Sequence, residues 1–559
     1  MRGLGSRAAA LDVLAATASG DPLDLLVVGG GITGAGIALD AASRGLKVGL
    51  VERFDFASGT SSKSSKLIHG GLRYLEQREF GLMREACTER DLLRRLAPHL
   101  VEPIPFVLPV SRRLTRAKFG VGLWAYDALA SFKNLRLHRH VDGAETESLV
   151  PALPRGQVQG GFVFYDCKTD DVRLVMEVLI QARRYGATAA NYCAARNLEG
   201  GEEGCVALVE DVLADERFEI SARRIVCAAG VWADRVEALA RPDAAARLRP
   251  SKGVHLLLPR DRIPLDEAAA FVPDVERRRM LFVVPWLDSV LVGTTDTHFH
   301  GSLDDPSVDE DDRAYCLDAV NTIFGTELGT GDIAGAYAGL RPLIAGERDA
   351  TADLSRRHSV YDIAPGIRGI TGGKLTTYRR MARDAVDRVA SDLGVTAKSR
   401  TRWIRLGSRN VDALQAAVSR RTHRLGLSSV VEANLVRCYG DRALDVLDVA
   451  AQEDALGPLA PDHQPIGAEA LYCARHEMTV TLADLLSRRT RLALTDPAGG
   501  IGHNSSAQPL LGGELGWSPA EKERQLLAYR HEVERERGMP FAVPPLPAPN
   551  ATRPQRAMG

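Results

Sequence analysis

The segment from Asp24 to Glu52 restricts the possible folds more than any other part of the chain. An apolar run at 25–28 precedes a helical pattern of small residues, and a second apolar run at 48–51 ends at Glu52. Between the first run and the helix stand three glycines with the spacing G-x-G-x-x-G: Gly29, Gly31 and Gly34. This order predicts a strand, a tight turn, a helix and a second strand, the unit that binds dinucleotides.

Each part of this unit contributes to the binding of a dinucleotide. One glycine permits the sharp turn, one lets the backbone approach a pyrophosphate, and one lets the helix pack closely on the strand. Unpaired N–H groups at the helix N-terminus favour the anion. Glu52 lies about twenty residues beyond the glycines, where a carboxylate can hold ribose hydroxyls. A glycine turn in another kind of α/β unit is the alternative, which the agreement of strand, helix and acid disfavours.

Length and composition bound the class of protein. A chain of 559 residues is too long for one ordinary core, so two or three domains are expected. Its 71 basic and 72 acidic residues nearly cancel, which argues against a nucleic-acid partner. The eight cysteines form no C-x-x-C pair, as expected of reduced, buried thiols in a cytoplasmic protein without a metal site. Residues 1–20 lack the apolar core of a signal peptide, and no apolar run is long enough to cross a bilayer.

Two loops and one strand end supply further candidate site residues. The segment after Glu52, up to residue 80, is dense in Ser, Thr and Gly and predicts a loop on which a site can be built, with a flexible surface loop as the alternative. A strand that ends in Ala-Ala-Gly at Gly230 is suited to close approach of a bound dinucleotide. A glycine turn at Gly372 and Gly373 enters a helix, which predicts a second helix N-terminus able to hold a ligand.

A basic and aromatic segment at 112–132 has two interpretations. Its arginines and Lys118 precede Phe119, Leu123, Trp124 and Tyr126. Such a composition is suited to contact with anionic lipid headgroups. A solvated basic helix that packs through its aromatic residues is the commoner explanation.

The second half of the chain changes from strands to helices. Strand patterns at 253–259, 279–286 and 289–296, without helices between them, predict an antiparallel sheet beside the nucleotide-binding domain. Helical periodicity dominates 411–450 and 468–494. The residues Ser518-Pro519-Ala520-Glu521 predict a capping box and a helix that ends near Arg537. The Pro-rich end of the chain is expected to be disordered.

Several motifs together resemble those of FAD-dependent glycerol-3-phosphate dehydrogenases, the non-nicotinamide type that feeds electrons towards respiration. They are GGGITGAGIALDAASRGLKVGLVER, TSSKSSKLIHGGLRYLE, PWLDSVLVGTTDT, GLRPL and GGKLTTYR. The block SSKLIHGGLRYLE is long and specific. The resemblance covers nearly the whole chain, except for the first twenty residues, a glycine-rich insert near residue 500 and the Pro-rich tail.

The resemblance, together with these patterns, implies an α/β fold. A Rossmann-like FAD-binding domain carries an antiparallel-sheet substrate region, as in glutathione reductase and amino-acid oxidases, and an all-α C-terminal domain follows. The expected division is an N-terminal extension at 1–22, interleaved FAD- and substrate-binding segments at 23–395, a helical domain at 396–538 and a tail at 539–559.

The resemblance also implies which residues hold FAD, with the loop Thr60–Leu67 over the flavin. The cofactor-binding set is Gly29, Gly31, Gly34, Glu52, Thr60, Ser61, Ser62, Ser65, Lys66, Leu67, Gly230, Gly372, Gly373, Leu375 and Thr376.

By the same resemblance, Arg73, Tyr74, Arg341 and Lys374 surround the substrate, and Arg356 is a weaker candidate. A phosphate dianion in a partly desolvated pocket needs several cationic donors, and a guanidinium offers a two-pronged fork. Arg341 and Lys374 are therefore also candidate catalytic residues.

The implied reaction is the oxidation of sn-glycerol 3-phosphate at C2 to dihydroxyacetone phosphate, with hydride passing to N5 of FAD and the hydroxyl proton to a base. Histidine is the natural base, and His255 is the first candidate, followed by His69 and His298. Each of them is also open to a packing role or a place near the flavin ring, so the base is unresolved at this point.

Members of this type usually reduce membrane quinone, so the resemblance implies a quinone acceptor and a peripheral position on the inner face of the cytoplasmic membrane. Related glycerophosphate oxidases use oxygen instead, and the sequence does not separate the two. The C-terminal helices are open to three roles: formation of a homodimer, docking of the acceptor, or stability alone.

Two other functions are alternatives to glycerol-3-phosphate oxidation. An amino-acid or amine oxidase of the same fold needs about one arginine for a carboxylate, whereas this chain offers a larger cationic set. A non-catalytic flavin-binding redox sensor is disfavoured by the presence of Arg73, Arg341 and Lys374 together.

Overall fold

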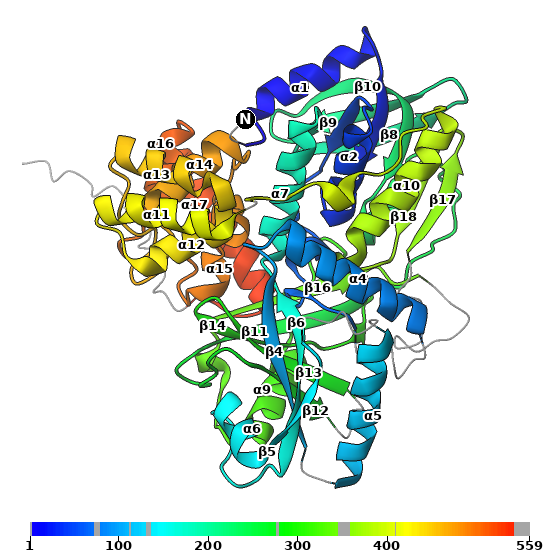
Figure 1. The fold of residues 1–559 in the computed structure, drawn as a ribbon. Coiled ribbons are helices and arrows are strands. Elements are labelled where there is room, and N and C mark those ends of the chain that lie inside the picture. Colours follow the sequence, from blue (N-terminus) through cyan, green and yellow to red (C-terminus); the bar gives the residue numbers. More distant parts are fainter. Residues whose placement is uncertain are drawn as a thin grey trace, which may run out of the picture.

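The computed structural model describes residues 3–71, 79–110, 113–129, 136–274, 279–344, 358–408 and 410–541. Figure 1 shows three parts: an α/β part with the N-terminus, a sheet part below it, and a group of C-terminal helices to one side. Among the helices described, none combines the length and apolarity needed to cross a membrane. All eight cysteines are buried and unpaired, as the sequence predicts.

The α/β part is built on a mixed sheet whose centre is parallel. Its strands in spatial order are β17 (Ser359–Ala364), β18 (Ile367–Thr371), β10 (Glu216–Cys227), β1 (Leu23–Val28), β2 (Val48–Val51) and β7 (Thr188–Ala190). Two antiparallel strands, β8 (Cys193–Gly200) and β9 (Cys205–Asp211), extend from β10. The strand–helix–strand unit expected at 25–52 therefore lies in the middle of this sheet.

Helix α2 (Ile32–Ser43) packs between α7 (Asp171–Arg184) and α10 (Tyr378–Asp392). Eleven of its twelve residues are buried, which its small side chains permit. A Cβ atom at Gly36 would come within 2.8 Å of the Tyr378 ring, so the glycine allows α10 to approach closely. The short α1 (Arg7–Ala15), with η1 (Ala16–Ala18), covers one edge, where Arg7 pairs with Asp211.

The sheet part is antiparallel except where β12 runs parallel to β4. Its strands in spatial order are β15 (Thr297–His298), β11 (Ser251–Pro259), β14 (Ser289–Gly293), β13 (Arg279–Trp286), β12 (Ala269–Asp274), β4 (Glu102–Val110), β6 (Gly160–Lys168) and β3 (Leu67–Ile68). At the sides, β16 (Gly335–Arg341) pairs with β11, and β5 (Arg139–Asp142) pairs with β6.

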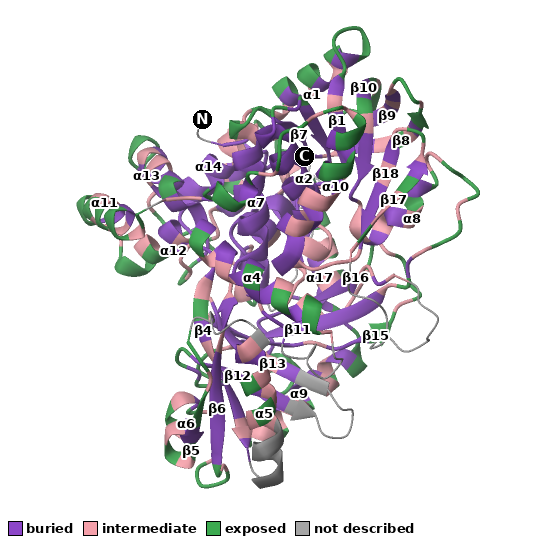
Figure 2. Ribbon diagram, turned by 45° about the vertical axis from the view of Figure 1, so that its right-hand side comes forward, coloured by how far each residue is buried: buried purple, intermediate pink, exposed green. Residues whose placement is uncertain are grey.

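Both faces of this sheet are covered, and Figure 2 shows the resulting buried strands. Along β11, Val254, Leu256 and Leu258 belong to one apolar core, and Leu257 between them belongs to another. This alternation follows from the two-residue period of a strand. The helices of this part are α5 (Arg113–Leu129), α6 (Gly143–Leu149) and α9 (Glu310–Phe324), and α4 (Phe80–Leu96) connects it to the α/β part.

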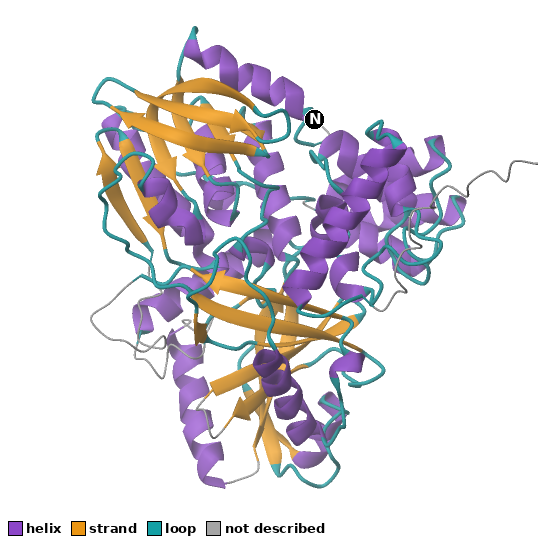
Figure 3. Cartoon of the chain, turned by 180° about the vertical axis from the view of Figure 1, so that it is seen from behind, coloured by secondary structure: helices purple, strands orange, loops and turns teal. Residues whose placement is uncertain are grey.

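The C-terminal helices form a separate apolar core and contain no strand among their described residues, as Figure 3 shows from behind. They are α11 (Val411–Arg424), α12 (Ser429–Tyr439), α13 (Ala443–Gln452), α14 (Gly467–His476), a π-helical turn η9 (Asp484–Arg489), α15 (Leu492–Thr495), α16 (Ala507–Glu514) and α17 (Pro519–Arg537). The predicted start and end of α17 are confirmed, and the Ser518 side chain accepts from the Glu521 N–H. Phe541 is buried, and the Pro-rich tail from residue 542 onward lies outside the described residues.

Buried ion pairs join the helical domain to the α/β part. They are Asp55 with Arg488 and Arg489, Arg173 with Glu477, Glu177 with Arg442, and Asp170 and Asp171 with Arg491. Removing one member of such a pair leaves an uncompensated buried charge, which is strongly destabilising. The relative position of the two parts is therefore closely specified.

His463 forms another junction, between the helical domain and the turn that connects β13 to β14. Its Nδ1 lies 3.6 Å from Asp288, and its Nε2 lies 3.7 Å from Asp496. The nearby carboxylates of Asp288 and Asp496 raise the pKa of His463 to about 9. Because the folded pKa lies above the ordinary value of 6.5, the junction stabilises the fold fully below pH 6.5 and loses this contribution as the pH rises through about 9.

We therefore expect His463→Gln to lower the free energy of unfolding by on the order of 1 kcal/mol near pH 6, as for a partly solvated ion pair. The difference from the unmodified chain should vanish by pH 10. Urea denaturation of both proteins at several pH values measures it. A difference that does not change with pH would show that the charge on His463 is not the cause.

Candidate active site

The three glycines after β1 have different structural tasks. Gly29 has a φ of +115°, a conformation that side chains disfavour, and its N–H donates to Val51 O. A Cβ atom at Gly34 would lie 1.8 Å from Gly29 O, so Gly34 permits contact of α2 with the turn. At Gly31, the N-cap of α2, the nearest atom to such a Cβ is Ser61 Oγ at 3.1 Å. The turn therefore has the form that lets a pyrophosphate approach a helix N-terminus.

Glu52 stands at the end of β2, beside this turn. Its carboxylate accepts from the N–H groups of Gly30 at 2.6 Å and Phe54 at 2.9 Å. Burial raises the pKa of Glu52, and the two backbone hydrogen bonds oppose that rise. Each carboxylate oxygen keeps a second lone pair, so Glu52 can still accept from ribose hydroxyls.

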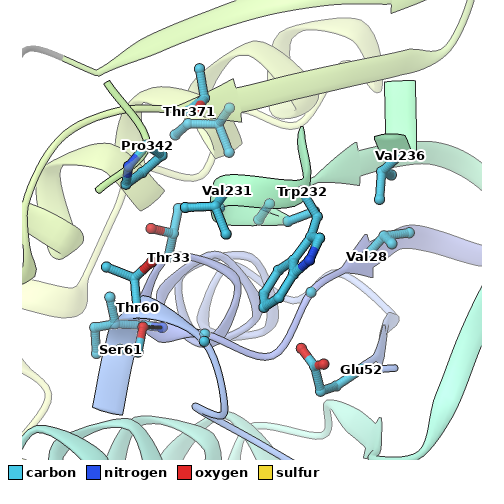
Figure 4. A pocket seen from close by; sticks show the side chains of 18 of the residues that line it. Val28, Thr33, Glu52, Thr60, Ser61, Val231, Trp232, Val236, Pro342 and Thr371 are labelled. Carbon is cyan, nitrogen blue, oxygen red and sulfur yellow. Dashed lines mark hydrogen bonds between the residues drawn. The ribbon is translucent and has the colours of Figure 1, made fainter. Parts of the chain in front are cut away.

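A cavity of about 310 Å³ runs from Glu52 past the turn, and Figure 4 shows Thr33, Thr60 and Ser61 on its wall. From the predicted cofactor set, the cavity is lined by Gly29, Gly31, Glu52, Thr60, Ser61, Gly230, Gly372, Gly373 and Leu375. Thr371 also lines it, and the buried hydroxyl oxygen of this residue has no hydrogen-bond partner within the described chain. A glycine-lined helix end, a carboxylate and an unused hydroxyl suit the phosphate, ribose and ring parts of FAD.

A second cavity, of about 210 Å³, adjoins the first and shares residues with it, Thr60, Lys374 and Leu375 among them. From the predicted set, it is lined by Thr60, Ser65, Leu67, His69, His255, Arg341, Gly372, Gly373, Lys374, Leu375 and Thr376. The folding of the chain therefore brings together two histidines and two cations from distant segments. A cationic cavity beside a dinucleotide site can hold an anionic substrate against the cofactor.

Arg341 ends β16 and lies across Gly253, where a Cβ atom would come within 2.3 Å of the guanidinium. One guanidinium nitrogen donates to Ser251 and Asp296 at 3.3 and 3.2 Å, and the other to Thr294 and the carbonyl of Thr295. These bonds fix the orientation of the charge. The side chain keeps 26% of its surface exposed, which leaves it accessible from the cavity that it lines.

His255 lies on β11 with its ring buried. Its Nε2 is 2.8 Å from Ser65 Oγ, and its ring stacks on Tyr337 with the centroids 5.0 Å apart. Burial, then the charges of Arg341 and Lys66, hold the pKa of His255 well below its ordinary value. Nδ1 has no hydrogen-bond partner within the described chain. In the tautomer that donates from Nε2 to Ser65, Nδ1 keeps its lone pair and can accept a proton.

Of the remaining predicted site residues, only some line one of the two cavities. His69 lines the second cavity, but His298 is exposed on the edge strand β15 and lines neither cavity. Gly34, Ser62 and Lys66 also line neither: Gly34 serves packing, and the Lys66 ammonium is fully buried against Asp171. The predictions for Arg73, Tyr74 and Arg356 fall outside the described residues. No group of His, Cys, Asp or Glu suited to a metal occurs among the residues that the structure describes.

The sequence interpretation missed some lining residues. Thr33, Trp232, Pro342 and Thr371 all line the first cavity, as does Ser64, which belongs to the predicted loop Thr60–Leu67 but not to the predicted cofactor-binding set. Each lies within two residues of a residue already in the predicted set, and this adjacency is the signal that could have identified them. Arg53 and Arg235 also line it, and both bind Asp304 of a loop from the sheet part.

Comparisons with known proteins identify the family of this chain. The family model described as FAD dependent oxidoreductase matches residues 24–379, and the one described as C-terminal domain of alpha-glycerophosphate oxidase matches residues 399–522. Glycerol-3-phosphate dehydrogenase 2 of Mycobacterium tuberculosis is 40% identical over 92% of this chain and 89% of its own length. The aerobic glycerol-3-phosphate dehydrogenase of Staphylococcus aureus is 35% identical over 92% of this chain and 94% of its own.

Solved structures show the same fold. The glycerol-3-phosphate dehydrogenase from Bacillus halodurans, complexed with FAD, has a TM-score of 0.78 and 30% identity, covering 96% of this chain and 98% of that one. L-α-glycerophosphate oxidase from Mycoplasma pneumoniae, with FAD bound, has a TM-score of 0.54 and 19% identity, covering 69% and 98%, and is similar in fold alone. The chain therefore belongs to the family of FAD-dependent glycerol-3-phosphate dehydrogenases, with FAD as its cofactor.

Proposed function

We propose that this protein oxidises sn-glycerol 3-phosphate to dihydroxyacetone phosphate and passes the electrons to a quinone. One observation carries the proposal: Arg341, Lys374 and His255, from three distant segments, line one cavity that adjoins the FAD cavity. The relatives named as glycerol-3-phosphate dehydrogenases support the same substrate.

In this proposal Arg341 and Lys374 bind the phosphate dianion, because both carry positive charge into a partly desolvated space. His255 accepts the proton of the C2 hydroxyl, and its depressed pKa keeps the imidazole neutral at physiological pH. When bound, FAD supplies the acceptor for the hydride.

The test is anaerobic. The purified yellow protein is mixed with glycerol 3-phosphate and, separately, with glycerol, and the flavin absorbance is followed. Bleaching by the phosphate ester alone is the expected result. A flavin that dithionite reduces but glycerol 3-phosphate does not would overturn the proposal, and amino acids would be tested next.

The acceptor and the membrane contact belong to the same proposal. Helix α5 exposes Val121 and Trp124, with 73% and 62% of their surface accessible, and the sequence of its first turns is basic. Apolar and aromatic side chains on a basic helix suit a peripheral contact with anionic lipid. Sedimentation with phosphatidylglycerol vesicles should recover the protein at low salt, and faster reoxidation of the flavin by a soluble quinone than by oxygen would support the acceptor. No sedimentation with the vesicles would refute the membrane contact, and no preference for quinone would refute the acceptor. Neither result would affect the proposed substrate.

Arg341→Ala is expected to raise KM for glycerol 3-phosphate about 10- to 100-fold, corresponding to a lost charged hydrogen-bonding group of about 1.5–3 kcal/mol. The kcat value should fall as well, because phosphate binding orients C2 toward the cofactor. Arg262→Ala is the matched control, since Arg262 is half exposed, pairs with Asp332 and lines neither cavity. Steady-state kinetics that are unchanged in Arg341→Ala would refute the phosphate pocket.

A further inference from the structure

The loop Ser62–Lys66 lines the second cavity through Lys63, Ser64 and Ser65. Two carboxylates hold it: Glu536 of α17, which pairs with Lys63, and the more deeply buried Asp171. Asp171, at the first position of α7, accepts from Ser64 Oγ at 2.7 Å and from the Lys66 ammonium at 3.1 Å. The ammonium also donates to the carbonyl of Ser62 at 3.0 Å. Asp171 is fully buried, so the middle of the loop at Ser64 and its end at Lys66 are attached to one point in the interior.

The Lys66 side chain is fully buried and lies beside two aromatic rings. Its ammonium lies 5.0 Å from the centroid of the Trp286 ring and 4.8 Å from that of Tyr337. Its φ of +55° is unusual for a residue with a side chain. Burial, then the charge of Arg491, lowers the pKa of Lys66 to about 8, against the opposing effect of Asp171 and Asp170. Lys66 is therefore part of a packed ionic cluster and not of a solvated loop.

The charge that completes this cluster comes from the helical domain. Arg491, 2% exposed, donates to Asp171 and, at 3.2 Å, to Asp170. It stands between η9 and α15 with a φ of +65°, so its backbone also adopts an unusual conformation. Asp171 thus binds both Lys66 and Arg491, and Asp170 binds Arg491 as well.

Ser65, the neighbour of Lys66 in this loop, reaches the proposed base. Ser65 Oγ lies 2.8 Å from His255 Nε2. Tyr337 donates its hydroxyl to the carbonyl of Ser64 at 2.6 Å and stacks on the His255 ring. Ser65 is the one hydrogen-bond partner of the His255 ring observed in the described chain, so a displacement of the loop would move that partner. It would also disturb Tyr337, which binds the loop and stacks on the ring.

We propose that Asp171 and Arg491 are positioning residues, through which the C-terminal helical domain fixes the loop Ser62–Lys66 and so holds His255 in its working orientation. The inference rests on the proposed function. Proton acceptance requires hydrogen-bond reach and a fixed tautomer, and a shift of about 1 Å can slow such a step severely. The helical domain would then be part of the catalytic apparatus although it lines neither the second cavity nor, in the described chain, the FAD cavity.

The competing explanation is that these charges only hold two domains together. The chain provides a control for it. Arg442, also from the helical domain and 3% exposed, binds Glu177 on the same helix α7 at 2.6 Å. This pair crosses the same domain boundary, but among the described residues the Glu177 carboxylate pairs with Arg442 and His99 and not with the loop. Arg442→Gln therefore breaks a buried pair of the same kind without altering the attachment of the loop.

The experiment compares the flavin-containing forms of the unmodified protein, Asp171→Asn, Arg491→Gln, Arg491→Lys and Arg442→Gln. Stopped-flow mixing with glycerol 3-phosphate under anaerobic conditions gives the limiting rate of flavin reduction and the concentration for half-saturation. The visible spectrum of the resting flavin and the thermal unfolding midpoint are recorded for each protein. If the unmodified protein is not bleached, the proposed function has failed, whereas the resting spectra, which need no substrate, still decide whether Asp171 and Arg491 fix the loop.

We expect Asp171→Asn and Arg491→Gln to lower the limiting rate at least tenfold, with less than a threefold change in half-saturation. Their resting flavin spectra should shift, because Ser64 lines both cavities. Arg491→Lys should recover most of the rate, and Arg442→Gln should lose stability but keep both rate and spectrum. Unchanged rates in the first two variants, or an equal loss in Arg442→Gln, would overturn the proposal. If Asp171→Asn or Arg491→Gln loses its flavin, Ser64→Ala is measured in its place. An unchanged limiting rate in Ser64→Ala would also overturn the proposal.

Discussion

His255→Asn is expected to lower the limiting rate of flavin reduction by glycerol 3-phosphate about a hundredfold or more, the usual range for removal of a general base. The glycerol 3-phosphate concentration for half-saturation should change little, because Arg341 and Lys374 still line the cavity. Since the pKa of His255 is held well below 6.5, the unmodified enzyme should keep its activity into mildly acidic solution and lose it only when the imidazole is protonated.

Two other histidines make this prediction specific. His298→Asn is the matched control, because its side chain is exposed on β15 and lines neither cavity. His69→Asn tests the rival base in the same cavity. Single-turnover reduction between pH 5 and pH 9 compares the three variants. If His69→Asn loses the rate and His255→Asn retains it, the assignment of the base is wrong.

Gly34→Ala should yield a protein without flavin. The added Cβ would lie 1.8 Å from Gly29 O and 3.0 Å from its carbonyl carbon, and these are backbone atoms that no rotamer change can move. The turn or α2 must shift, and with it the helix end that receives the pyrophosphate. We expect FAD affinity to fall at least a hundredfold, or about 3 kcal/mol.

The control for this variant is Gly81→Ala. Gly81 is the second residue of α4, and a Cβ there meets no atom within 4 Å. Alanine should be neutral or slightly stabilising at this helical position. Flavin absorbance per protein after reconstitution measures both variants. A Gly34→Ala protein with full flavin content would show that the turn has more room than the structure gives it.

Local patterns predicted the nucleotide-binding unit well, because strand, turn and helix signals all lie within thirty residues. The strands β1 and β2 end where the apolar runs at 25–28 and 48–51 end. The antiparallel pairs β11–β14 and β13–β14 follow from neighbouring segments. The parallel contact between β12 and β4 joins residues more than 150 positions apart, and no local pattern encodes it.

Other features depend on distant partners and so escaped prediction. A serine-rich loop does not reveal that the Lys66 ammonium turns inward, since its partner Asp171 is far along the chain. The sequence ranked His255 first but could not exclude His298, because the exposure of His298 depends on its place at a sheet edge. The helical period at 468–494 is interrupted at residues 477–481, where Met478 has a φ of +51° although the apolar pattern continues.

The ion pairs between the helical domain and the α/β part have a consequence for biosynthesis. Asp55, Asp170 and Asp171 are made early, yet the arginines that neutralise them, Arg488, Arg489 and Arg491, leave the ribosome some 320 to 430 residues later. Until then the nascent α/β part cannot bury these carboxylates without a large electrostatic cost. The loop beside the substrate cavity therefore reaches its final form only near the end of translation. A message truncated before residue 488 should give a product that fails to retain FAD, although every glycine of its nucleotide turn is present.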